Sequence, residues 1–270
     1  MQKLLTRMRV MITGASRGIG SSIAKMFAKK HGEHAKISML SRSAIQPSHH
    51  KLEGTLSDTA DEISKYGSLP FIHKVDLRKE SEVEEAVSKT MRAFDDKLDV
   101  LILNASVLSF SQKPKDIDLL FKINVRSTLH MIQLCKPYLK KSNGCIVSLS
   151  PPVRMGRLDW ISSTPAYTIS KYGMTMACLS AADTVRSNCL WPKRMIRTAA
   201  TKRLEEMNQV PGAFNEGRDP EEFAKAIQEL VNNKRINARC MFDEDLVSMN
   251  DEYTAPLDAY VDPPETYPIM

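Results

Sequence analysis

Apolar positions along the chain alternate between short runs typical of buried strands and amphipathic stretches typical of helices. The strand-like runs occupy residues 10–13, 36–41, 71–75, 100–103, 145–149, 189–191 and 239–242. The helical spacing appears between them, at residues 21–30, 56–63, 81–94, 116–140, 165–186 and 224–231. Strands that alternate with helices are joined by right-handed crossovers into a parallel sheet. The pattern therefore predicts an α/β fold: a doubly wound parallel sheet of about seven strands, flanked by helices.

No internal repeat or interdomain linker interrupts the alternation, so we expect a single domain at residues 1–250. Residues 251–270 are acidic and rich in proline without helical spacing, which predicts an extended tail. No apolar run reaches the roughly 20 residues of a membrane helix. The start of the chain lacks signal-peptide architecture, so we expect a cytoplasmic protein. The basic residues 1–9 leave a mitochondrial or peroxisomal address open.

The charge distribution favours an anionic ligand. The formal net charge is +6, yet no Lys or Arg follows Arg239 and every charged residue there is acidic, so the rest of the chain is more basic than the total suggests. Nucleic acid is one candidate ligand, but the chain carries no nucleic-acid-binding motif and only 6% aromatic residues. A phosphorylated cofactor fits better. The five cysteines lack metal-ligand spacing, so we expect buried, reduced thiols and no metal site.

A glycine-rich octet, TGASRGIG at residues 13–20, lies where the first predicted strand meets the first helix. Glycines there permit a tight turn and let backbone N–H groups approach a pyrophosphate at the positive end of the helix. A tight turn can need glycine without any ligand, but the position ahead of further βα units favours nucleotide binding. The candidate cofactor-binding residues of the octet are Gly14, Ser16, Arg17, Gly18, Ile19 and Gly20.

The end of the second strand indicates which nucleotide binds. NAD sites place an acidic residue there for the ribose hydroxyls, whereas this strand ends at Ser41-Arg42. Arg42 and Arg17 together match a 2′-phosphate. Two solvated arginines are the alternative interpretation. We expect NADP (NADPH) in preference to NAD.

Tyr167 and Lys171 stand four residues apart in the helix after the fifth strand. This spacing puts the phenol and the ammonium on one helical face. A phenol with a pKa near 10 is a poor acid or base at neutral pH, and a nearby cation favours its phenolate. The pair alone is a weak signal, but here it follows a nucleotide-binding loop.

Together these motifs resemble those of the short-chain dehydrogenase/reductase family over residues 9–242. The motifs that match in order are TGASRGIG, Asp76-Leu77, Leu103-Asn104-Ala105, Asn124 and Tyr167-xxx-Lys171. The resemblance implies a Rossmann-type fold, a homodimer or homotetramer, and an Asn124 that orders a water in a proton relay; a locally satisfied amide is the alternative for Asn124. It also implies cofactor contacts from Asp76, Leu77, Asn104, Ala105, Lys171, Pro192 and Thr198.

The chain is more closely similar to a hydroxysteroid dehydrogenase-like group within that family. The similar stretches are residues 149–152, 166–174, 190–193 and 196–200, with the loop at 46–55. Fuller members of the group carry a C-terminal sterol-carrier domain, for which we expect no counterpart here. This resemblance implies a lipid-like or steroid-like substrate.

Two departures from the family pattern concern the substrate side of the site. Pro151 occupies the position of the usual catalytic serine, so Ser150 becomes the candidate, with Ser162 or Ser163 as alternatives. Lys193 replaces a usual glycine and could reach the cofactor phosphates or an acidic substrate. We expect an NADP-dependent oxidoreductase that interconverts a carbonyl and a secondary alcohol, with Tyr167 as proton donor. The alternative is a catalytically weak or inactive NADP-binding protein with a sensing or scaffolding role.

Overall fold

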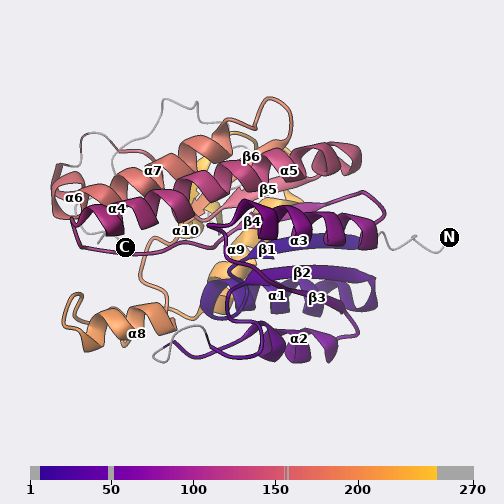
Figure 1. Cartoon of the computed structure of the whole chain (residues 1–270), viewed down its shortest axis with the longest axis horizontal. Coiled ribbons are helices and arrows are strands. Elements are labelled where there is room, and N and C mark those ends of the chain that lie inside the picture. The colour runs from indigo at the N-terminus through magenta and orange to yellow at the C-terminus, as the bar shows by residue number, and fades with distance from the viewer. Residues whose placement is uncertain (1–6, 48–51, 155, 157, 248–270) are drawn as a thin grey trace.

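A computed structural model describes residues 7–47, 52–154, 156 and 158–247. Its centre is a seven-stranded sheet in the order β3-β2-β1-β4-β5-β6-β7, in which every neighbouring pair is parallel (Figure 1). The strands are β1 (Met8–Thr13), β2 (Ala35–Ser41), β3 (Leu69–Lys74), β4 (Val100–Leu103), β5 (Cys145–Ser148), β6 (Arg186–Trp191) and β7 (Cys240–Phe242). The order reverses between β1 and β4, so the predicted doubly wound fold is confirmed.

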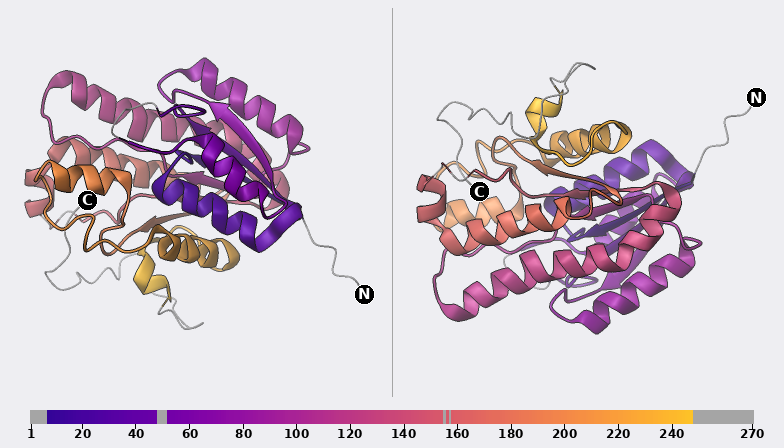
Figure 2. Two further views of the ribbon diagram at one scale, coloured as in Figure 1. Left: turned by 90° about the horizontal axis from the view of Figure 1, so that it is seen from below. Right: turned by 90° about the horizontal axis from the view of Figure 1, so that it is seen from above.

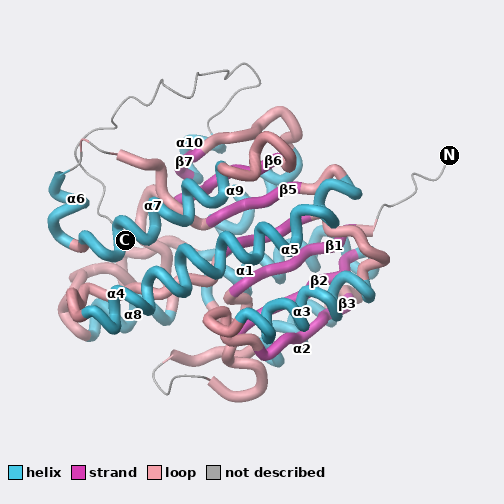
Figure 3. Tube along the Cα trace, turned by 45° about the horizontal axis from the view of Figure 1, so that its top comes forward, coloured by secondary structure: helices cyan, strands magenta, loops and turns pink. Residues whose placement is uncertain are grey.

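Helices cover both faces of the sheet (Figures 2 and 3). One face packs against α1 (Gly18–His31), α2 (Leu56–Ser64) and α9 (Pro220–Asn232). The other packs against α3 (Glu80–Ala93), α5 (Ser127–Ser142) and α7 (Pro165–Leu179). Shorter segments connect these layers: η1 (Gly32–His34), α4 (Pro114–Leu120), η2 (Phe121–Arg126), α6 (Leu158–Ser163), α8 (Ala199–Glu206) and α10 (Asp243–Val247). No described helix is long and apolar enough to cross a membrane.

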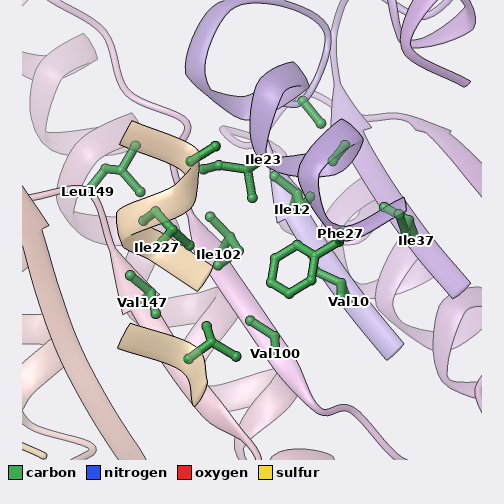
Figure 4. Packing of buried hydrophobic residues seen from close by; sticks show 14 of the residues in the cluster. Val10, Ile12, Ile23, Phe27, Ile37, Val100, Ile102, Val147, Leu149 and Ile227 are labelled. Carbon is green, nitrogen blue, oxygen red and sulfur yellow. The ribbon is translucent and has the colours of Figure 1, made fainter. Parts of the chain in front are cut away.

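The core consists of two apolar layers, one on each face of the central strands. Alternate residues of β1 and β4 point to opposite layers, as the two-residue repeat of a strand requires. Val10 and Val100 contact the layer of α1 and α9, where Phe27 and Ile227 meet them (Figure 4). The intervening residues join the layer of α3, α5 and α7. Burial on both faces explains why these strands are continuously apolar in sequence.

Several predicted boundaries were wrong for identifiable reasons. The helix expected at residues 116–140 is α4, the π-helical turn η2 and α5 in succession. The helix expected at 165–186 ends at Leu179, and β6 starts at Arg186 rather than near residue 189. Sequence analysis missed α8 because Leu204 is its only buried side chain. The predicted tail, residues 251–270, lies outside the described residues.

Candidate active site

The carboxyl ends of the parallel strands bring the predicted site residues to one edge of the sheet. The glycine loop follows β1, Arg42 follows β2, and Asp76 comes after β3. Asn104 and Ala105 follow β4, and Ser150 lies two residues beyond β5. Pro192 directly follows β6. Ligands of open α/β sheets bind outside this edge, at the point where the strand order reverses.

The glycine loop is packed too tightly for side chains at its key positions. A Cβ atom on Gly20 would lie 2.3 Å from the carbonyl oxygen of Gly14 and 2.6 Å from Nδ2 of Asn104. Gly14 itself has φ +71°, a left-handed conformation that favours glycine. These two glycines permit the tight turn into α1, whose N-terminus is the end of a helix that favours a pyrophosphate.

Asn104 braces this loop from the neighbouring strand. Its Nδ2 donates to the carbonyl oxygens of Thr13 at 2.9 Å and Gly14 at 3.0 Å. The backbone N–H groups of Asn104 and Ala105 both donate to Oγ1 of Thr13 at 3.1 Å. Thr13 is thus a supporting residue of the site that sequence analysis missed. The sequence did offer a signal for it, since Thr13 ends the first strand and begins the glycine-rich octet.

Thr198, at the start of α8, lies beside the glycine loop although it is far from it in the sequence. A Cβ atom on Gly18 would lie 3.2 Å from Cγ2 of Thr198. The Thr198 side chain caps α8 by accepting from the N–H of Thr201 at 3.2 Å. Of the remaining candidates, Ser16 is buried, Ile19 and Leu77 pack at the margins of the two core layers, and Pro192 is half-buried.

Arg17 and Arg42 form a cationic pair beside the loop. Burial and the nearby charge of Arg42 lower the pKa of Arg17. Arg17 donates from Nη2 to Oγ of Ser43 at 2.5 Å and from Nη1 to the carbonyl of Leu52. Arg42 is exposed and makes no hydrogen bond or ion pair among the described residues. Two like charges held together in this way favour an anion between them.

Asp76 lies close enough to Arg42 to sense its charge. The Arg78 guanidinium, at 2.5 Å, is the main reason why the pKa of Asp76 is lowered, and the charge of Arg42 adds to the effect. Asp76 and Arg42, two of the predicted cofactor contacts, therefore share one region of the sheet edge. The carboxylate of Asp76 is already neutralised by its ion pair with Arg78.

Tyr167 and Lys171 lie on one face of α7, and both are almost completely buried, at 6% and 2% exposure. Tyr167 packs with Leu120 and Ala166, and burial alone raises its pKa. Burial lowers the pKa of Lys171 to about 7. The phenol thus lies in apolar surroundings, in which burial and not the ammonium determines the direction of its pKa shift.

The Lys171 ammonium is held by groups from three elements. Its Nζ donates to the carbonyl oxygen of Leu149 at 2.6 Å and lies 3.3 Å from Sδ of Met174. The Trp191 ring lies under it, with 4.9 Å between Nζ and the ring centroid. Sequence analysis assigned Trp191 no role, although strand alternation places it on the α7 side of β6.

Asn124 is fully buried in the π-helical turn η2. Its Oδ1 accepts from the N–H of Val107 at 2.9 Å, and its Nδ2 donates to the Val107 carbonyl at 3.0 Å and to Oγ of Ser170 at 2.9 Å. The side chain thereby joins the loop after β4 to α7. These contacts use the amide for local structure, and a water relay through Asn124 stays a prediction.

Ser150 is buried beneath α7 rather than open at the sheet edge. Its Oγ donates to Oγ of Ser148 at 3.0 Å. The next residue, Pro151, accepts at its carbonyl from Oγ1 of Thr175 at 2.6 Å, which fastens the strand end to α7. The alternative hydroxyls, Ser162 and Ser163, are exposed on α6.

Asp243 supports the segment that follows β6, and sequence analysis missed it. Its buried carboxylate accepts from the backbone N–H of Lys193 at 2.9 Å and from the guanidinium of Arg218. Arg218 in turn pairs by backbone hydrogen bonds of 2.8 Å with Met195 and Arg197. The Lys193 ammonium pairs with Asp245 at 2.9 Å. The ion pairs and hydrogen bonds of Asp243, Asp245 and Arg218 therefore hold residues 193–197 in place.

The reversed parallel sheet, the glycine loop and the Tyr167-Lys171 face define a nucleotide-binding oxidoreductase class. A family model described as short chain dehydrogenase matches residues 8–209. The chain belongs to the short-chain dehydrogenase family, which confirms the resemblance seen in its motifs.

Among curated proteins, the chain is similar to hydroxysteroid dehydrogenase-like protein 2 from Xenopus laevis, at 37% identity over 92% of this chain and 59% of that protein. The chain thus spans less than two thirds of the length of that relative. A short chain dehydrogenase structure from Mycobacterium thermoresistibile is 32% identical, with a TM-score of 0.79 over 90% of this chain and 87% of that one.

The fold is also that of an alcohol dehydrogenase from Thermococcus sibiricus complexed with 5-hydroxy-NADP. That structure is 21% identical to this chain, with a TM-score of 0.69 over 87% of this chain and 95% of that one. At this identity the similarity establishes the fold.

Proposed function

We propose that the protein is an NADP-dependent oxidoreductase that interconverts a carbonyl and a secondary alcohol. The observation that carries the proposal is the shared face of Tyr167 and Lys171 on α7, at the sheet edge that also carries the glycine loop. When bound, the nicotinamide supplies or accepts the hydride. The chain's own residues bind the nucleotide, position the substrate oxygen and move a proton at the Tyr167 hydroxyl.

NADP rather than NAD is supported by Arg17 and Arg42. Burial and, secondly, the charge of Arg42 lower the pKa of Arg17, and a bound dianionic phosphate would relieve the repulsion between the two guanidinium groups. The backbone of the glycine loop would hold the pyrophosphate at the start of α1. Glycine at positions 14 and 20 permits this turn, because a Cβ atom at either would clash with the loop itself or with Asn104. Thr198 and Pro192 would complete the far wall.

An apolar substrate is supported by the surroundings of Tyr167. Val107, Leu108 and Ile117 pack beside Leu120 and the tyrosine, so a substrate that reaches Tyr167 would meet apolar side chains, which suits a lipid-like or steroid-like carbonyl. The name of the hydroxysteroid dehydrogenase-like relatives agrees with this class. The cytoplasm remains our proposed compartment, with mitochondria or peroxisomes as alternatives.

A homodimer or homotetramer is supported by apolar side chains on the outer surfaces of α5 and α7. Leu129, Ile169 and Met176 are 41%, 51% and 59% exposed. Neighbouring exposed apolar residues on two adjacent helices suit contact with another copy of the chain. Sedimentation analysis of the purified protein would test this assembly.

A catalytically weak or inactive NADP-binding protein is the second candidate. Two observations favour it: the Ser150 hydroxyl is buried against Ser148, and Pro151 stands where the family places its serine. Such a protein would bind the nucleotide through the glycine loop and Arg42 without rapid turnover.

Oxidation of NADPH across a panel of ketones, aldehydes and fatty acyl derivatives separates the two candidates. An enzyme is expected to turn over at least one class, with Tyr167→Phe losing the turnover and keeping NADPH binding. Calorimetric NADPH binding with no turnover across the panel would favour the binding protein. Absence of NADPH binding would reject both.

A further inference from the structure

Trp191 lies at the carboxyl end of β6, directly before Pro192, and is 8% exposed. Its neighbour on the same side of the strand is Cys189, whose Sγ lies 3.9 Å from the carbonyl oxygen of Thr175 on α7. Trp191 therefore also points toward α7. There the indole ring meets the Lys171 ammonium at 4.9 Å.

The Lys171 ammonium is buried, and in the part of the chain that the structure describes neutral groups surround it in place of a carboxylate. At 2% exposure it has little water around it, and it forms no ion pair with a carboxylate among the described residues. Its described contacts are the Leu149 carbonyl, Met174 Sδ and the Trp191 ring. Burying an ammonium without compensation is costly. An indole face is the best aromatic partner for a cation, and the attraction grows when both are removed from water.

Other titratable groups on this side of the sheet do not replace the indole. They come from α7, α5, β6, β7 and the loop after β5, and comprise Tyr167, Tyr172, Cys178, Cys135, Cys189, Cys240 and Arg154. Of these, only Cys189 acts on the pKa of Lys171, and it favours the ammonium. The indole differs from Cys189 because its attraction does not itself depend on pH.

We propose that Trp191 is a positioning residue that holds the charged Lys171 ammonium against the Leu149 carbonyl at the end of β5. The consequence for the reaction rests on the proposed function, in which Lys171 serves the nucleotide and Tyr167. The contact itself does not depend on the nucleotide. As the last residue of β6, Trp191 thereby links that strand to the face of α7 that carries Tyr167 and Lys171.

Trp191 fluorescence tests the contact without cofactor or substrate. The chain has two tryptophans, Trp160 and Trp191, so Trp160→Phe leaves Trp191 as the only one. An ammonium against an indole quenches its emission. We expect emission to rise with pH through a midpoint near 7, as Lys171 loses its proton.

Two further variants in the same background identify the cation. Adding Lys171→Met should abolish the transition and leave the emission high throughout. The matched control is Lys141→Met, which removes an ammonium 5.4 Å from the Tyr138 ring on α5 and should leave the transition unchanged. An absent transition, or one that persists without Lys171, would overturn the proposal.

The pH dependence of NADPH affinity measures what the contact does. Trp191→Leu keeps an apolar side chain but removes the ring face, which should lower the Lys171 midpoint by about one pH unit. Affinity should then fall about fivefold near pH 7 and hardly change near pH 5, where Lys171 stays charged in both proteins. Trp191→Phe retains a ring face and should stay close to the parent.

The two measurements fail separately. Identical affinity profiles for the parent and Trp191→Leu would overturn the positioning role. If NADPH binds to no variant, but the Trp191 transition is present and needs Lys171, the contact stands and the proposed cofactor is wrong. The fluorescence test changes nothing at position 191, so it holds even if Trp191→Leu folds poorly.

Discussion

The buried carboxylate of Asp243 accepts a hydrogen bond from the backbone N–H of Lys193 at 2.9 Å, across 50 residues of sequence. The same carboxylate pairs with Arg218, which is 12% exposed. Asp243 thus ties the segment after β6 to the residue two positions before α9.

Asp243→Asn should reduce the free energy of unfolding by about 2 kcal/mol or more, because Arg218 keeps its buried charge and loses its main partner. Urea unfolding measures this loss. The control is Asp245→Asn, which breaks a pair that is half-exposed at the carboxylate and should cost less than about 1 kcal/mol. Equal losses in the two variants would contradict the role given to Asp243.

Cofactor choice should follow Arg42. NADPH should bind at least ~10-fold tighter than NADH, about 1.4 kcal/mol for one charge-assisted contact. Arg42→Asp should reverse the order, since a carboxylate repels the 2′-phosphate and accepts from ribose hydroxyls. Calorimetry measures both affinities, with Arg92→Asp on the exposed surface of α3 as control. Equal affinities in the parent protein would count against the assignment.

Tyr167→Phe should abolish turnover and leave folding and NADPH affinity nearly intact, because it removes only the phenolic hydroxyl. Lys171→Ala should lose both turnover and affinity, since the ammonium is proposed to serve the tyrosine and the ribose together. Steady-state kinetics and calorimetry separate the two effects. Turnover at the parental rate by Tyr167→Phe would reject the mechanism.

Ser150→Ala tests whether the buried hydroxyl contributes to the reaction. Because Ser150 donates to Ser148 beneath α7, we expect turnover to change little. A catalytic Ser150 would instead cost roughly 10²–10³ in rate, as for loss of an oxyanion donor. Pro151→Ser should raise turnover by restoring the family's hydroxyl, provided that the strand end keeps its conformation.

Gly20→Ala should destabilise the fold by about 1–3 kcal/mol and weaken NADPH binding, because the new Cβ atom meets backbone at Gly14 rather than a movable side chain. Gly156→Ala is the matched control, since, its two chain neighbours aside, no atom of the described residues lies within 4 Å of a Cβ at that position. Thermal unfolding and calorimetry measure the two effects. A stable Gly20→Ala protein with parental affinity would show that the loop can relax.

Sequence patterns predicted the sheet and the position of the loop well because buried parallel strands are continuously apolar and glycine turns are distinctive. They could not locate Asp243, whose partners Lys193 and Arg218 are brought to it only by the return of the chain through α9. The environment of Lys171 was hidden for the same reason. Its spacing from Tyr167 was visible, but the Leu149 carbonyl lies just after β5 and the Trp191 ring lies on β6, both far from α7 in the sequence.

The π-helical turn at Phe121–Arg126 also escaped prediction, because the apolar residues on each side of it keep ordinary helical spacing and do not mark where the extra residue lies. Such a turn carries one residue more than an α-helical turn, so it rotates α4 about the common axis by roughly 100° relative to α5. Leu120 can therefore face Tyr167 while Met131 and Cys135 face the sheet core. The number of residues in this turn therefore determines the rotation of α4 relative to α5. Deleting a single residue there would turn the wall of the pocket away from Tyr167, a change that no side-chain substitution in α4 could reproduce.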